Sequence, residues 1–210
     1  MIIGFSHISQ TCRYIDSEAN LLVSQGFEQK FIIRNLANHP SKQSIVRGES
    51  FPKTHSIGLF HHQDSVVTEL IEYENISERD CPRYKIDGKS IVLKANQIDA
   101  EVTFWKNALK CKEVAHHHLQ FASFVKSWNG DFIFEQTDQP LEKPMLNDVG
   151  LNCFAFYVKG LDTFLTEIQT YNAVLKVAPF ELRVNDRNLR VAMLRSPDGN
   201  IIELIEVKND

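Results

Sequence analysis

The last third of the chain opens with LNCFAFYVKG (residues 151–160) and closes with SPDGNIIELIEVK (residues 196–208), and these two stretches decide the fold. The first alternates strand-forming residues in the manner of a half-buried strand. Asp162 follows it and can cap a helix, DTFLTEIQTYNA. After the helix come three further strand patterns: VLKVAPFELRV, NLRVAMLRS and NIIELIEV. The expected order is therefore strand, helix and three strands.

The first third of the chain repeats this order. The strand pattern GFSHISQT precedes a helix, DSEANLLVSQ, which begins at Asp16 or Ser17 and ends before Gly26. Three strand patterns follow: FEQKFIIRN, HSIGLFHH and SVVTELIEYE. A long polar stretch, residues 39–53, separates the first two of these strands.

The middle of the chain gives the order a third time. The strand KSIVLKANQ precedes Asp99, which we expect to cap the helix AEVTFWKNALK. The strands KEVAHH, HLQFASFVK and DFIFEQTD follow. Polar linkers flank this unit, so we expect three modules, at 1–76, 88–138 and 148–208.

The closing strands of the three units each carry a glutamate at the same point. TELIEYE and IELIEVK share Glu-Leu-Ile-Glu, which begins at Glu69 in one and at Glu203 in the other, and FIFEQTD places Glu135 there. Alternate residues of a strand share a face, so each glutamate falls on an otherwise apolar face. A buried lone carboxylate is costly, and each therefore needs a metal, a cation, a hydrogen-bond donor or water.

These patterns resemble the vicinal-oxygen-chelate superfamily, which includes glyoxalases, bleomycin-resistance proteins and extradiol dioxygenases. The resemblance rests on the start around His7, on DAEVTFWKNALKCKEV, and on the ending MLRSPDGNIIELIEV, in which Ser196 replaces the usual Asp. It covers most of the chain. It implies an α+β fold of βαβββ modules, with curved mixed sheets that form a cup and helices outside. It also implies that the middle and C-terminal modules together form one two-module domain, 88–210, beside the N-terminal module. The superfamily includes both enzymes and binding proteins, so the fold alone does not give the activity.

The resemblance also implies a ligand set. Two such modules form one cup, and each supplies a residue of its first strand, often His or Gln, and a Glu of its last strand to a divalent metal. Transferred to this chain, the N-terminal unit has both ligands, His7 and Glu69, with Glu69 also the candidate catalytic base. Iron, manganese, nickel or zinc would suit nitrogen and oxygen ligands of this kind.

The other two units match this ligand set less completely. The middle unit has Glu135, but Val92 stands at its first-strand position, and the C-terminal unit has Glu203 with Cys153 at that position. Glu135, Glu203 and Cys153 are therefore candidate ligand-binding residues. The N-terminal half-site has no obvious partner within the chain, and a homodimer that pairs it with its own copy would complete it.

Composition excludes several other classes of protein. The net charge is −4 with no basic block, which argues against nucleic acid as a partner, and no apolar run approaches the ~20 residues of a membrane span. Four scattered cysteines without a secretion signal predict free thiols in a cytoplasmic protein.

Two main functions follow from these expectations. The first is metal-dependent chemistry, of the lyase, isomerase or dioxygenase kind, on a substrate with vicinal oxygens. The alternative is a metal-free protein that sequesters an aromatic or amphipathic small molecule. A third class is a degenerate module that serves only in assembly.

Overall fold

A computed structural model describes residues 1–80, 83–87, 89–121 and 130–208. It confirms the α+β class and the repeated order of strand, helix and three strands. The N-terminal unit comprises β1 (Ile2–Thr11), α1 (Ile15–Ser24), β2 (Glu28–Ala37), β3 (Thr54–His61) and β4 (Thr68–Tyr73). A short 3-10 helix, η1 (Pro40–Ile45), lies within the polar stretch between β2 and β3.

The other two units follow the same order. The middle unit comprises β7 (Ser90–Ala95), α2 (Ile98–Asn107), β8 (Cys111–Ala115), β9 (His118–Phe121) and β10 (Asp131–Gln136). The C-terminal unit comprises β11 (Asp148–Val158), α3 (Leu161–Ile168), η2 (Gln169–Tyr171), β12 (Val174–Val184), β13 (Arg187–Arg195) and β14 (Ile201–Val207). Two short strands, β5 (Ser77–Asp80) and β6 (Tyr84–Asp87), precede the middle unit. The later part of the expected strand HLQFASFVK lies outside the described residues.

Strand order within the sheets is the same in all three units. The last strand lies between the first and the third, which gives β2-β3-β4-β1, β8-β9-β10-β7 and β12-β13-β14-β11. The first and last strands of each unit run parallel, and their neighbours run antiparallel. The three units are therefore repeats of one βαβββ module, as the matching glutamates predict.

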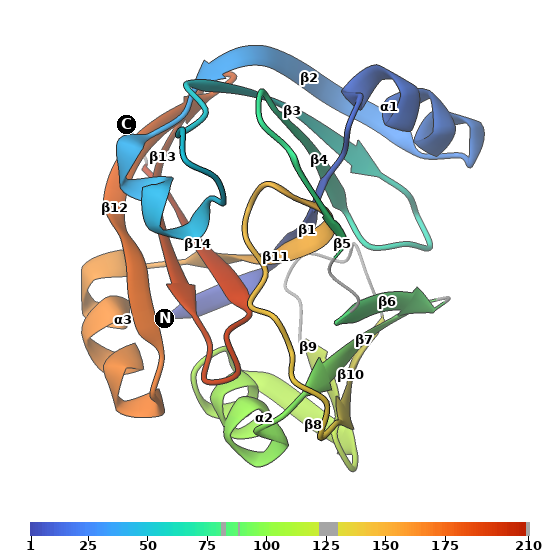
Figure 1. The fold of residues 1–210 in the computed structure, drawn as a ribbon. Coiled ribbons are helices and arrows are strands. Elements are labelled where there is room, and N and C mark those ends of the chain that lie inside the picture. The colour runs from blue at the N-terminus through green and yellow to red at the C-terminus, as the bar shows by residue number, and fades with distance from the viewer. Residues whose placement is uncertain (81–82, 88, 122–129, 209–210) are drawn as a thin grey trace.

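The pairing of the units differs from the expected grouping. The first strands β1 and β11 pair antiparallel, which joins the N-terminal and C-terminal units in one curled sheet. The middle unit, with β6, forms a separate five-stranded sheet below it (Figure 1). The expected cup of the middle and C-terminal modules is therefore not the one that the sheets make. The N-terminal unit has its partner within the chain and needs no second copy for this.

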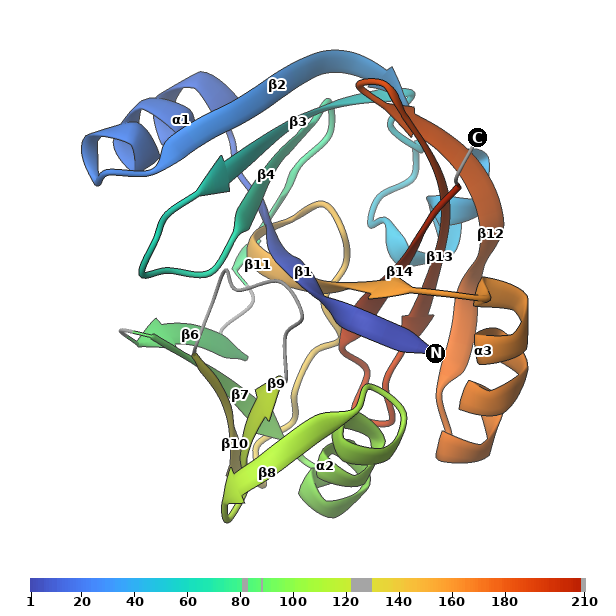
Figure 2. The same cartoon turned by 180° about the vertical axis from the view of Figure 1, so that it is seen from behind.

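Aromatic side chains explain where the middle unit sits. Phe154 and Phe156 alternate along β11 with residues that face the cup, so they lie on its outer face. Trp105 of α2 contacts both rings, and Phe132 of β10 packs edge-to-face against Phe5 of β1. All five rings are fully or nearly fully buried. The middle unit thus packs against the face of the β1–β11 junction that points away from the cup, and it lies below these strands in Figure 2.

Three helices have their first N–H groups bound by a carboxylate from a closing strand or its turn. Glu72 of β4 accepts from Ile15 of α1, and Glu206 of β14 accepts from Gly160 and Leu161 at the start of α3. Asp198, in the turn before β14, accepts from the backbone N–H groups of residues 96 and 97, which precede α2. An acceptor at a helix start satisfies N–H groups that have no partner within the helix.

The expected caps Asp99 and Asp162 were therefore wrong, and α1 begins at Ile15, one residue before the expected Asp16. Asp16, Asp99 and Asp162 lie within the first turns of their helices. The residue that precedes each helix forms no side-chain capping hydrogen bond. A distant carboxylate takes that role in each case, from the same unit for α1 and α3 and from the C-terminal unit for α2.

Two further features bear on the expectations from composition. Cys12, Cys111 and Cys153 are free thiols, and Cys81 lies outside the described residues. Within the described ranges, the helices are too short and too polar to cross a membrane.

Candidate metal and ligand site

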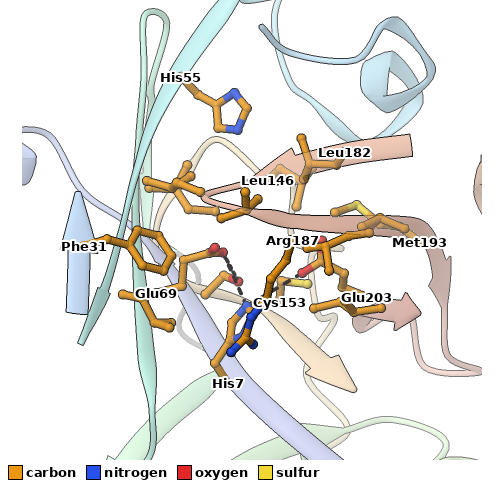
Figure 3. Close-up of a pocket in the computed structure, with 18 of the residues that line it drawn as sticks. His7, Phe31, His55, Glu69, Leu146, Cys153, Leu182, Arg187, Met193 and Glu203 are labelled. Atoms are coloured by element: carbon orange, nitrogen blue, oxygen red, sulfur yellow. Dashed lines mark hydrogen bonds and ion pairs between the residues drawn. The ribbon is translucent and has the colours of Figure 1, made fainter. Parts of the chain in front are cut away.

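A cavity of about 390 Å³ lies inside the curled sheet, between the N-terminal and C-terminal units. This volume falls in the range of small-molecule sites. Its walls are mostly apolar, and polar residues from both units, His7, Lys42, His55, Glu69, Arg187 and Glu203 among them, also line it. Figure 3 shows part of this lining, which includes His7, Phe31, His55, Glu69, Cys153, Leu182, Arg187, Met193 and Glu203.

His7, Glu69 and Glu203 meet at the floor of the cavity. The Nε2 atom of His7 lies 3.5 Å from Oε2 of Glu69 and 3.8 Å from Oε2 of Glu203. One ligand atom from each residue lies within 4.8 Å of the other two. The three side chains converge from β1, β4 and β14 (Figure 3).

The register of the sheet explains this convergence. In the parallel pair β1–β4, Glu69 lies opposite Ser9, and in β11–β14, Glu203 lies opposite Ala155. The antiparallel pair β1–β11 places Ala155 opposite His7. The two glutamates therefore flank the junction from either side, and His7 lies between them.

Nε2 of His7 is a buried polar atom without a hydrogen bond. Both carboxylate distances exceed the usual 2.7–3.2 Å of such bonds. A buried polar atom without a hydrogen bond is costly, so its presence needs a reason. A metal ion bound by the same three side chains would supply one, because ligands of one ion stand apart from each other by about these distances.

Two serines orient these groups. Oγ of Ser6 lies 2.9 Å from Nδ1 of His7, and the hydroxyl of Ser9 donates to Oε2 of Glu69 at 3.0 Å. Outer partners of this kind fix the tautomer of a metal-binding histidine and the rotamer of a carboxylate ligand. If Nδ1 donates its proton to Ser6, the lone pair of Nε2 faces the two carboxylates.

The charges of the cluster depend on each other. Burial alone would lower the pKa of His7, but the negative charges of Glu69 and Glu203 raise it above its ordinary value of 6.5. Burial raises the pKa of Glu69, but the charge of His7 and the hydrogen bonds from His7 and Ser9 lower it by more. The pKa of Glu69 therefore lies below its ordinary value. Burial, followed by the charge of Glu69, raises the pKa of Glu203.

Cys153 lies in the cavity wall but outside the cluster of three ligand atoms. Burial, and then the negative charges of Glu203 and Glu69, raise the pKa of its thiol well above the ordinary value. The thiol is therefore protonated at neutral pH when no metal is present. Glu135, in contrast, is an exposed residue of β10 in the second sheet and does not line this cavity.

Several residues of the cavity had no signal in the sequence. Lys42 of η1 is buried, and His55 of β3 stacks on Tyr73 with ring centroids 5.5 Å apart. Burial, followed by the positive charge of Lys42, lowers the pKa of His55 to about 4. Arg187 lines the cavity from the start of β13. Lys42 could have been predicted only by assuming that the long polar stretch between β2 and β3 folds over the cup.

Comparisons with known proteins extend to the fold only. No protein-family model matches the chain, and neither does any curated protein sequence. Its structural neighbours include glyoxalase I and a member of the glyoxalase/bleomycin resistance/dioxygenase family.

Glyoxalase I from Zea mays is 13% identical over 97% of this chain and 67% of that chain, with a TM-score of 0.41. A glyoxalase/bleomycin resistance protein/dioxygenase family enzyme from Burkholderia phytofirmans is 13% identical, over 59% of this chain and 100% of that chain, with a TM-score of 0.44. An integron cassette protein from V. cholerae is 20% identical, over 58% and 96%, with a TM-score of 0.41. Likenesses this low transfer no activity, so the function must be argued from this chain's own residues.

Proposed function

We propose that this protein binds a small molecule with vicinal oxygens in the cup and acts on it with a divalent metal held by His7, Glu69 and Glu203. The observation that carries the proposal is the buried Nε2 of His7, which forms no hydrogen bond and lies between two carboxylates at 3.5 and 3.8 Å. Glu203, which the sequence offered only as a candidate ligand-binding residue, is thus a proposed metal ligand.

The residues present fit such an ion. One imidazole and two carboxylates form a nitrogen and oxygen donor set, which suits iron, manganese, nickel or zinc. Three protein ligands leave further coordination positions for substrate or water, as catalytic metal sites require. When bound, the ion would act as a Lewis acid toward the vicinal oxygens of the substrate.

The chain's own groups would do the remaining work. Ser9 holds Glu69 in place, and the apolar walls exclude water from the floor of the cavity. The sequence assigns the base to Glu69. Glu203 has the raised pKa, which is the property of an effective proton acceptor near neutral pH, so we include it as a second candidate base.

The metal-free alternative has its own support. Among the described residues, the thiol of Cys153 stands where a second first-strand ligand would be, and its raised pKa disfavours the thiolate. The lowered pKa of Glu69 and the raised pKa of His7 also describe an ion pair that can persist without metal. In that case the cup would sequester an aromatic or amphipathic compound.

Metal content separates the two functions. Protein purified without an affinity tag should contain a divalent metal by elemental analysis, and calorimetric titration with Mn, Fe, Ni and Zn should show one site. His7→Ala should abolish binding, because two carboxylates alone hold these ions weakly. His61→Ala is the matched control, since this β3 histidine does not line the cavity. Unchanged binding in His7→Ala, or none in the wild type, would contradict the metal site.

A further inference from the structure

A cation lies buried in the wall of the cup, separate from the three proposed metal ligands. Lys42 belongs to η1 and is 7% exposed, yet its side chain lines the cavity. Lysine is rarely buried to this extent unless it is paired. Its position therefore needs an explanation that the metal site does not give.

The ammonium of Lys42 has no anionic partner among the described residues. The contact that the structure gives it is with the ring face of Phe180, 5.6 Å from Nζ to the centroid. Neither Glu69 nor Glu203 forms an ion pair with it, although its charge lowers the pKa of both. Glu69 and Glu203 thus line the same cavity as Lys42 but form no ion pair with its ammonium.

The backbone that carries Lys42 is firmly held. His39 stacks on Phe180 with ring centroids 4.4 Å apart, and the hydroxyl of Ser44 donates to the carbonyl oxygen of Lys176 on β12. Ile45 is fully buried in the core that lines this side of the sheet. These contacts anchor the segment at the wall of the cup, so Lys42 keeps its place in the lining.

The rim of the cup adds a second positive charge. Arg187, an exposed residue at the start of β13, lines the same cavity. The cavity lining carries three basic side chains, those of Lys30, Lys42 and Arg187, and two carboxylates, those of Glu69 and Glu203, so positive charge is in excess with or without a divalent ion. A cleft with excess charge of one sign attracts ligands of the other.

Apolar side chains occupy most of the space around these charges. Ile57 and Leu59 of β3 face the cavity from one unit, and Leu182 and Met193 face it from the other. From these observations we propose that the ligand of the cup is a carboxylic acid with an apolar body, whose carboxylate binds Lys42. One buried ammonium offsets one negative charge, which favours a carboxylate over a phosphate dianion.

This inference rests on the proposed small-molecule cup but not on the metal, so the two can fail separately. The test uses the full chain stripped of metal with a chelator, and three probes with the same ring system. Calorimetry or competition measures the dissociation constants of 1-naphthoate, 1-naphthamide and 1-naphthyl phosphate. The wild type should bind the acid about tenfold more tightly than the amide, or better, because a hydrogen bond to a charged group contributes that much.

Three variants assign the preference to Lys42. Lys42→Met should bind acid and amide equally, with the amide within about twofold of wild type, and Lys42→Arg should keep the preference for the acid. Lys53→Met is the matched control, because it removes an equal charge from an exposed position of the same insertion. Lys53 does not line the cavity, so its variant should bind as the wild type does.

Stability measurements keep the result interpretable. If Lys42 serves a ligand, its removal should leave the unfolding midpoint unchanged or raise it, because binding groups often reduce stability. A clear fall in the midpoint of Lys42→Met would instead make Lys42 a structural counter-charge for the glutamates and overturn the proposal. Equal wild-type affinity for acid and amide would also overturn it, and tighter binding of the phosphate would overturn the choice of a carboxylate.

Discussion

Cys153 occupies, in the C-terminal half of the cup, the place that His7 occupies in the N-terminal half. Across the antiparallel pair β1–β11, Ser9 lies opposite Cys153 and His7 lies opposite Ala155. If the two halves are exchanged, His7 takes the position of Cys153 and Ser9 takes the position of Ala155. The same pairs of positions then still lie opposite each other across β1–β11. The cup is therefore symmetric in its backbone and asymmetric in its donors, with an imidazole on one side and a thiol on the other.

This asymmetry predicts a gain of function. Cys153→His should add a second imidazole at the position related to His7 and tighten metal binding by about tenfold or more, since four protein ligands hold such ions better than three. Calorimetric titration with Zn and Ni measures the change. Cys153→Ser is the control, because it removes the thiol without adding a strong ligand and should leave the affinity near that of the wild type. A large loss in Cys153→Ser would instead identify the thiol as a ligand.

Metal binding should strengthen as the pH rises. In the metal-free protein the pKa of His7 lies above 6.5, so the ion must displace a proton from the imidazole near neutral pH. Before metal is added, the protonated His7 stabilises the fold below pH 6.5, and this contribution is lost as the pH rises through the higher folded pKa. Titrations at pH 7 in two buffers with different ionisation enthalpies should show proton release. Binding without proton release would argue against His7 as the ligand.

Acid should weaken the fold through His55. Its pKa falls from 6.5 to about 4 on folding, so protonation favours the unfolded chain. The stability associated with neutral His55 is present above pH 6.5 and is lost as the pH falls toward 4, by up to ~3 kcal/mol. Urea unfolding at pH 7 and pH 4.5 should show a smaller loss for His55→Gln than for the wild type. The same loss in both proteins would exclude His55 as the cause.

Local pattern was enough to predict the module and the two glutamates that line the cavity. Strand alternation and helix spacing depend on neighbouring residues, and Glu69 and Glu203 share a motif whose place in the strand sets the face. Both glutamates therefore line the cavity as expected from an otherwise apolar face. The fold class and the repeat of the unit were confirmed for the same reason.

Local sequence pattern could not predict which of the three modules pair. The sequence favoured adjacent modules, whereas aromatic packing of Trp105 and Phe132 places the middle unit behind the β1–β11 junction. Glu135 then lies on a sheet that is not part of the cup, although its strand position matches that of the other two. Lys42 was missed because it belongs to an insertion outside the repeat, where no periodicity indicates a direction.

We expect one glutamate of the Glu-Leu-Ile-Glu motif to serve metal binding and the other to serve stability, and the C-terminal copy offers a clear test of this division. Glu203 faces the cavity, whereas Glu206, three residues later, lies on the other face and accepts from the N–H groups of Gly160 and Leu161. Glu206→Ala should cost about 1 kcal/mol of unfolding free energy through loss of the cap, while metal affinity stays unchanged. Glu203→Ala should abolish metal binding and leave the stability of the metal-free protein equal or higher, because a buried carboxylate is removed. Denaturant unfolding after chelation and calorimetric titration, applied to both variants, measure the two effects. Loss of metal in Glu206→Ala, or a larger loss of stability in Glu203→Ala, would contradict this division.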